Sequence, residues 1–87
     1  MKPFSEAWYP PALPLRAYVA VDVEAIATEE DGCFRVDNDD DAAFFGVYLR
    51  DNDGLAECVA DLHTRARAEA LAATLMLLLL LEVVKQR

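Results

Sequence analysis

The sequence has little of what catalytic and metal-binding sites are usually built from. Its 87 residues include one histidine, two cysteines and three glycines. The cysteines, Cys33 and Cys58, are too few and too far apart for a secreted disulfide framework or a CxxC zinc site, so we expect buried, reduced thiols. No phosphate-binding loop, Ser-His-Asp set or metal-ligand spacing occurs. We therefore expect a protein without enzyme activity, with no cofactor and no catalytic or metal-binding residue.

An acidic run comes closest to a metal motif. Asp37, Asp39 and Asp41 alternate as the first ligands of a calcium-binding loop do. Such a loop also needs glycine at its sixth position and a carboxylate at its twelfth, where this chain has Ala42 and Tyr48. The run is therefore predicted to be a solvated acidic turn.

A thiol, a carboxylate and the only histidine lie close together in the sequence. On a regular strand Cys58 and Asp61 would point to opposite faces. We therefore expect a core thiol at Cys58 and a surface histidine at His63, rather than a nucleophile with its base.

Basic residues are also scarce. Eight lysines and arginines stand against 16 acidic residues, a net charge of −8. This charge repels phosphates and anionic membranes, so we expect neither direct nucleic-acid binding nor membrane binding. The uncharged run 70–81 is also shorter than the roughly 20 residues that cross a bilayer. Because prolines and Glu6 interrupt the N-terminal segment, we expect no signal peptide and a cytoplasmic protein.

The chain divides into an arm and one small domain. Residues 1–15 contain all four prolines together with Phe4, Trp8 and Tyr9, which predicts an extended arm whose aromatic rings lie against the domain or a neighbour. Residues 16–87 are predicted to form a single α+β domain.

Alternating apolar residues predict antiparallel strands in the first part of this domain. Val19, Val21 and Val23 alternate with polar or small residues, and Asp51 to Gly54 form a strong hairpin signal. The first strand begins after Arg16, and the others are predicted at residues 33–36, 43–50 and 55–62.

One long helix is predicted to follow, with Thr64 as its N-cap and its end near Lys85. Leu71 and Leu75 lie on a stripe that should face the sheet. The predicted fold is therefore a three- to four-stranded antiparallel meander packed against one long C-terminal helix, an α+β fold.

Beyond Leu75 this helix is apolar on every side, and we expect its end to project past the short strands. A small domain cannot cover so much apolar surface, which predicts a homodimer. The expected oligomer interface consists of Leu77, Leu78, Leu79, Leu80 and Leu81.

The acidic residues are concentrated in the predicted turns. A meander would bring the first and third turns to one end of the sheet and the second turn to the other. These carboxylates either keep the protein soluble or imitate phosphates and bind a partner with a basic surface. The candidate partner-binding residues are Glu29, Glu30, Asp31, Asp37, Asp39, Asp40, Asp41, Asp51 and Asp53.

The stretch FFGVYLRDNDG, followed by LAECVADLHTRARAEALAATL, resembles small acidic proteins of phages and mobile elements with a strand-turn-strand-helix unit. The resemblance covers about a third of the chain. Proteins of that kind include anti-CRISPR inhibitors, so it implies an inhibitor acting in the cytoplasm of a host cell. No inhibitor residue can be carried over from it.

Two functions follow from the sequence. The first is an acidic protein-binding module, a DNA mimic that inhibits a nucleic-acid-binding host defence complex. The alternative is a structural or assembly subunit that forms homo-oligomers through its leucine-rich helix and is acidic only for solubility.

Overall fold

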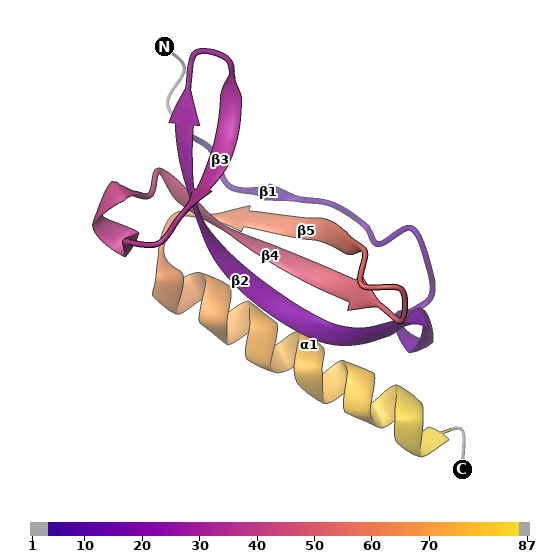
Figure 1. Cartoon of the computed structure of the whole chain (residues 1–87). Helices are drawn as coiled ribbons and strands as arrows, with labels where there is room; N and C mark the ends of the chain where they lie inside the picture. Colours follow the sequence, from indigo (N-terminus) through magenta and orange to yellow (C-terminus); the bar gives the residue numbers. More distant parts are fainter. Residues whose placement is uncertain (1–3, 86–87) are drawn as a thin grey trace.

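The computed structural model describes residues 4–85, which form one antiparallel sheet and one long helix (Figure 1). The predicted α+β class, with an antiparallel sheet packed against a long C-terminal helix, is confirmed. The elements are β1 (Ala7–Trp8), η1 (Leu15–Ala17), β2 (Tyr18–Glu29), β3 (Gly32–Val36), η2 (Asp39–Asp41), β4 (Phe44–Asp51), β5 (Ala56–Leu62) and α1 (Arg65–Lys85).

The sheet has five strands in the order β1-β5-β4-β2-β3, and every neighbouring pair is antiparallel. The additional strand is β1, which comes from the N-terminal arm and pairs with the outer edge of β5. Tyr9 follows it and its hydroxyl donates a hydrogen bond to Asp61 at 2.9 Å, while Trp8 stays 58% exposed. The arm therefore lies against the sheet.

The position of β2 explains the shape of the molecule. β2 has 12 residues and pairs with β4 along one edge. Along its other edge, only the second half of β2 has a partner, the shorter strand β3. Beyond Ile26, which lies opposite Phe44, β2 has no β4 partner, so the end of β2 and β3 project from the sheet as a two-stranded ribbon (Figure 1). The molecule is accordingly elongated, with extents of 49 × 23 × 22 Å.

This register overturns one expectation about the acidic turns. Asp51, at the end of β4, pairs with Tyr18 at the start of β2, whereas Glu29 is the last residue of β2. The first and third turns therefore lie at opposite ends of β2. The expectation assumed that each strand pairs with the next in the sequence, but β2 lies between β3 and β4.

The core lies between the sheet and α1. Phe45, Val47 and Leu49 point from β4 toward the helix, and the last two are completely buried. From α1 the buried residues are Ala68, Ala72 and Leu79. Leu71 and Leu75 pack against this cluster, as expected. Within residues 4–85, no helix is both long enough and apolar enough to cross a membrane.

The start of α1 is fixed by polar contacts. The Thr64 hydroxyl accepts a hydrogen bond from the Arg67 backbone N–H at 3.1 Å, which confirms the predicted N-cap. Arg65 and Arg67 lie in a turn where the helix dipole disfavours positive charge. Each is compensated by acidic partners, Arg65 by Asp39 and Glu69, and Arg67 by Glu6.

Candidate functional site

The face of α1 turned away from the sheet is apolar and exposed. Its residues lie three or four positions apart, so they follow one side of the helix opposite the buried residues Ala68, Ala72 and Leu79. We call this set the outer seam. It consists of Ala66, Ala70, Ala73, Leu77, Leu80 and Val84, all of which are exposed.

The five leucines expected at an oligomer interface do not share one environment. Leu77 and Leu80 belong to the outer seam and are 63% and 56% exposed, and Leu81 borders it. Leu78 lies toward the side of the helix and is less exposed, at 39%. Leu79 is buried in the chain's own core. An interface on the outer seam therefore cannot include the Leu79 side chain.

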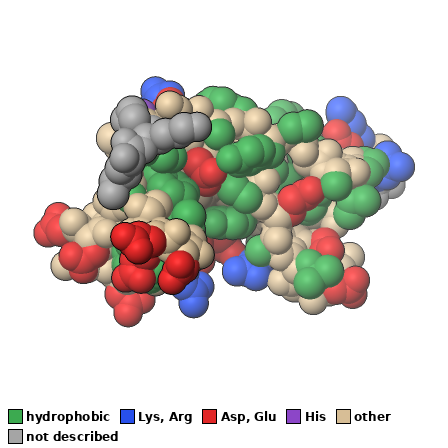
Figure 2. Space-filling view, turned by 90° about the horizontal axis from the view of Figure 1, so that it is seen from above, with side chains coloured by type: hydrophobic (Ala, Val, Ile, Leu, Met, Phe, Trp, Pro, Cys, Tyr) green, Lys and Arg blue, Asp and Glu red, His purple; other side chains and the backbone are tan. Residues whose placement is uncertain are grey.

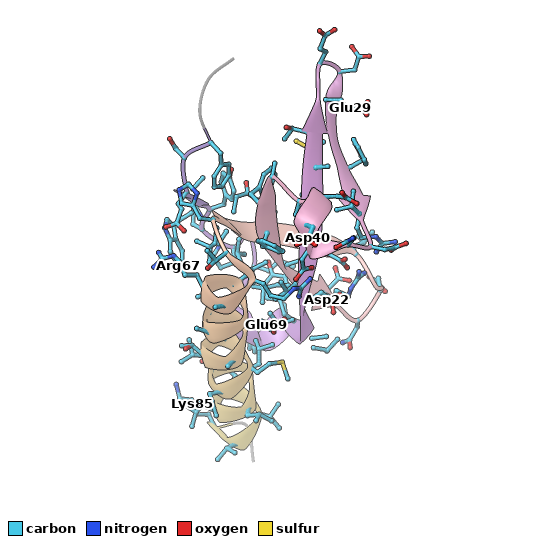
Figure 3. The ribbon with its side chains drawn as sticks, turned by 90° about the vertical axis from the view of Figure 1, so that its left-hand side faces the viewer. Asp22, Glu29, Asp40, Arg67, Glu69 and Lys85 are labelled. Carbon is cyan, nitrogen blue, oxygen red and sulfur yellow. The ribbon has the colours of Figure 1, made fainter. Side chains whose placement is uncertain are left out.

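Two of the three acidic turns share one end of the molecule. Glu29, Glu30 and Asp31 are exposed at the tip of the β2–β3 ribbon, and the η2 turn with Asp40 lies beside the base of that ribbon (Figure 3). Figure 2 shows acidic side chains gathered most densely around these two segments. We call this region the acidic end.

The remaining acidic candidates, Asp51 and Asp53, lie at the other end of the sheet. Asp51 is in the β4–β5 turn, where its side chain accepts hydrogen bonds from the backbone N–H groups of Asp53 and Leu55 at 2.9 and 3.1 Å. The structure thus separates Asp51 and Asp53 from the acidic end.

Asp39 also differs from its neighbours. It accepts two hydrogen bonds from the Arg65 guanidinium, one of them at 2.8 Å, and this ion pair lowers the pKa of Asp39. Arg65 also lies over the Phe45 ring at 5.3 Å. The contact joins the η2 turn to the start of α1, so Asp39 holds the acidic end in place.

The sheet face without a helix carries a groove of about 780 Å³ that the sequence did not predict. It lies where the ribbon turns away from the sheet, and apolar side chains cover much of this face (Figure 2). Its walls combine aromatic, thiol and charged groups, including Phe34, Arg35, Phe44, Tyr48, Cys58 and Asp61.

Inside the groove the structure corrects the expected placement of Cys58 and Asp61. Their side chains lie on the same face, and the thiol of Cys58 donates a hydrogen bond to Asp61 Oδ1 at 3.4 Å. The reason is a bulge in β5, where Val47 pairs with Ala60 but Tyr48 pairs with Cys58. The extra residue changes the alternation of side chains along the strand.

This arrangement makes Cys58 a poor nucleophile. Burial, and then the negative charge of Asp61, raise the pKa of the Cys58 thiol to about 12. The reactive species of a cysteine is the thiolate, which is scarce at neutral pH when the pKa is this high. The groove therefore has the concave form of a binding site, but Cys58 is not activated as a nucleophile in it.

The remaining residues that were considered as chemical sites are Cys33 and the acidic run. Cys33 is exposed on β3 rather than buried, because this part of the ribbon projects from the sheet (Figure 1). Cys58 is only partly buried and lies in the wall of the groove, so it is not the core thiol that was expected. Both cysteines are free thiols. In the part of the chain that the structure describes, no three His, Cys, Asp or Glu side chains are grouped so as to hold a metal ion.

Comparisons with known proteins add no relative. No protein-family model, no curated protein and no solved structure matches this chain.

Proposed function

We propose that this chain is a non-enzymatic assembly module that associates with itself through the outer seam of α1. The observation that carries the proposal is the exposure of large apolar side chains along one side of a well-packed helix. Leu77, Leu80 and Val84 are 63%, 56% and 64% exposed, although the opposite side of the same helix is part of the core. A helix that is apolar on both sides is normally buried on both sides.

The energetics favour association. Five large apolar side chains in or beside the outer seam are each more than half exposed, those of Leu77, Leu80, Leu81, Val83 and Val84. Together they make a patch of several hundred Å², the size of the largest patch on a typical monomer. Covering about 500 Å² on each of two protomers contributes on the order of 20 kcal/mol. Association costs about 4 to 15 kcal/mol, which leaves a net gain of at least about 5 kcal/mol, enough for a dimer at about 100 μM.

Sedimentation equilibrium of the intact chain tests this function. We expect a dimer at about 100 μM, which requires roughly 5 kcal/mol of net association free energy. Leu77→Glu combined with Leu80→Glu should give a folded monomer, because both side chains are exposed in the single chain. Leu78→Glu is the control, since it introduces a glutamate on the same helix outside the seam and its border, and it should remain a dimer. A monomeric wild-type protein would contradict the proposal.

A second function, binding of a basic protein partner, is supported by the acidic end. The ribbon tip and the η2 turn both place exposed carboxylates there, and α1 runs away from it (Figure 3). An acidic surface of this kind suits a groove that normally binds nucleic acid, in line with the inhibitor that the sequence resemblance implies. In this function the outer seam still joins two copies.

A short peptide of lysine and arginine serves as the probe for the acidic end. Replacing Glu29, Glu30 and Asp31 by their amides should weaken binding and reduce its salt dependence. Asp53→Asn, at the opposite end of the sheet, is the control and should have a smaller effect per charge removed. Equal effects per charge would contradict a specific binding role of the acidic end and would mean that the acidic residues serve solubility alone.

A further inference from the structure

We propose that the outer seam of α1 is covered by the outer seam of a second copy, with the two helices antiparallel. The inference rests on the proposed self-association and adds its orientation and its register. The spacing of the seam residues supports it. From Ala66 to Val84 they follow each other at intervals of four, three, four, three and four residues, the spacing of core positions in a coiled coil.

The sizes of the seam residues favour the antiparallel orientation. The half near the start of α1 has three alanines, and the half near its end has Leu77, Leu80 and Val84. In an antiparallel pair each layer combines a small residue with a large one: Ala66 lies opposite Val84 of the second copy, Ala70 opposite Leu80, and Ala73 opposite Leu77. Such layers have nearly constant volume along the interface, which permits close packing at a constant distance between the helices.

A parallel pair would distribute the volume unevenly. Alanine would lie opposite alanine at one end, and Leu77 and Leu80 would lie opposite their own copies at the other. The helices would have to diverge or leave a gap beside the alanines, and gaps forfeit packing contacts.

The residues that border the seam are compatible with the antiparallel pair. Beside the alanines lie Arg67 and Glu69, and their charges are paired within the chain, Arg67 with Glu6 at 2.7 Å and Glu69 with Arg65 at 2.9 Å. Beside the large residues lie Met76, Leu81 and Val83. Antiparallel packing brings the paired charges beside apolar side chains of the second copy, so no like charges meet.

The charge of the whole molecule points to the same orientation. The chain has a net charge of −8, and its acidic end lies beside the start of α1, as the contact of Asp39 with Arg65 shows. In a parallel dimer the two acidic ends would be adjacent. In an antiparallel dimer they are about 30 Å apart, the length of α1, which exceeds the screening length of about 8 Å at physiological salt.

The exposed area suits a second copy as the occupant. Leu77, Leu80 and Val84 are each more than half exposed, and so are Leu81 and Val83 beside them. Covering these side chains removes on the order of 500 Å² from water, a large part of the roughly 800 Å² that one partner contributes to a stable interface. Polar atoms at the border supply the rest. The seam is therefore large enough to join two copies.

Disulfide trapping distinguishes the orientations. In a background with Cys33→Ser and Cys58→Ser, one chain carries Ala70→Cys and the other carries Leu80→Cys. Both positions are exposed, so the substitutions spare the core, and circular dichroism checks the fold. Antiparallel packing places the two cysteines opposite each other, whereas two copies of position 80 are about 15 Å apart, beyond the reach of a disulfide.

We expect the mixed disulfide to exceed either homodisulfide by about tenfold, because only that pair has a high effective concentration. Homodisulfides at both positions without the mixed product would show a parallel dimer and overturn this inference while leaving self-association intact. A dimer without any crosslink would place its interface elsewhere and overturn it too. A monomeric protein would overturn the proposed function itself.

Discussion

The Cys58 thiol and the Asp61 carboxylate lie 3.4 Å apart on one face of β5, although three positions separate them along the strand. A bulge between Cys58 and Ala60 produces this arrangement, and it places a thiol, a carboxylate and the Tyr9 hydroxyl in contact at the wall of the groove. The contact between Cys58 and Asp61 makes Cys58 less reactive than Cys33.

We expect alkylating reagents at pH 8 to modify Cys33 well before Cys58. Cys33 is exposed, whereas burial and the charge of Asp61 raise the pKa of Cys58 to about 12. Peptide mass spectrometry after timed alkylation measures the two rates. Asp61→Asn should accelerate the modification of Cys58 by removing the neighbouring negative charge, while burial keeps it slower than Cys33. Equal rates in the wild-type protein would contradict the structure.

The ion pairs at the start of α1 predict acid sensitivity. Arg67 lowers the pKa of Glu6, and Arg65 lowers the pKa of Asp39. The ordinary pKa is 4.5 for Glu6 and 3.8 for Asp39. Above that value each carboxylate stabilises the folded state fully, and this contribution is lost as the pH falls through the lower pKa of the folded state. Thermal unfolding followed from pH 6 to pH 2 should show this loss.

Substitution identifies the groups responsible. Asp39→Asn should lower the stability at pH 7 and make the decline at acid pH shallower, because the variant has no carboxylate to protonate there. Glu6→Gln should act in the same way. An unchanged decline in the double variant would mean that other carboxylates control the acid sensitivity.

Much of the fold followed from local pattern. The β4 strand, the hairpin signal from Asp51 to Gly54 and the N-cap at Thr64 each depend on neighbouring residues, and each was predicted correctly. The order of the strands was harder, because the side-chain alternation of β2 does not reveal which strand pairs with each of its edges. The separation of the acidic turns depended on that order.

The sites were less predictable than the strands. The sequence indicated an excess of leucine at the end of α1, but only the packing of α1 on the sheet separated the buried Leu79 from the exposed Leu77 and Leu80. The groove was missed because it depends on the bulge in β5 and on the departure of the ribbon from the sheet. A helical wheel centred on Leu71 and Leu75 could have found the outer seam.

Gly46 is expected to be required for the position of Tyr48. A Cβ atom at Gly46 would lie 2.8 Å from the Tyr48 ring, so Gly46→Ala should force the ring toward the groove. We expect a loss of about 1 to 3 kcal/mol in the free energy of unfolding. A double-mutant cycle in urea supplies the control. In a Tyr48→Ala background the alanine should cost much less, and an equal cost in both backgrounds would show that the ring is not the obstacle.

The two sides of α1 should respond differently to the same substitution. Leu79→Ala removes a side chain that is 6% exposed and should lower the free energy of unfolding by about 2 to 5 kcal/mol at any protein concentration. Leu77→Ala removes one that is 63% exposed, so in dilute solution it should change stability by only about 0.5 kcal/mol.

At high concentration the stability of the wild-type protein should rise, because association stabilises the folded chain. Leu77→Ala should reduce that rise, and Leu79→Ala should retain it. Urea unfolding at two concentrations a hundredfold apart measures both quantities, and a concentration dependence that Leu77→Ala leaves unchanged would remove the outer seam from the interface.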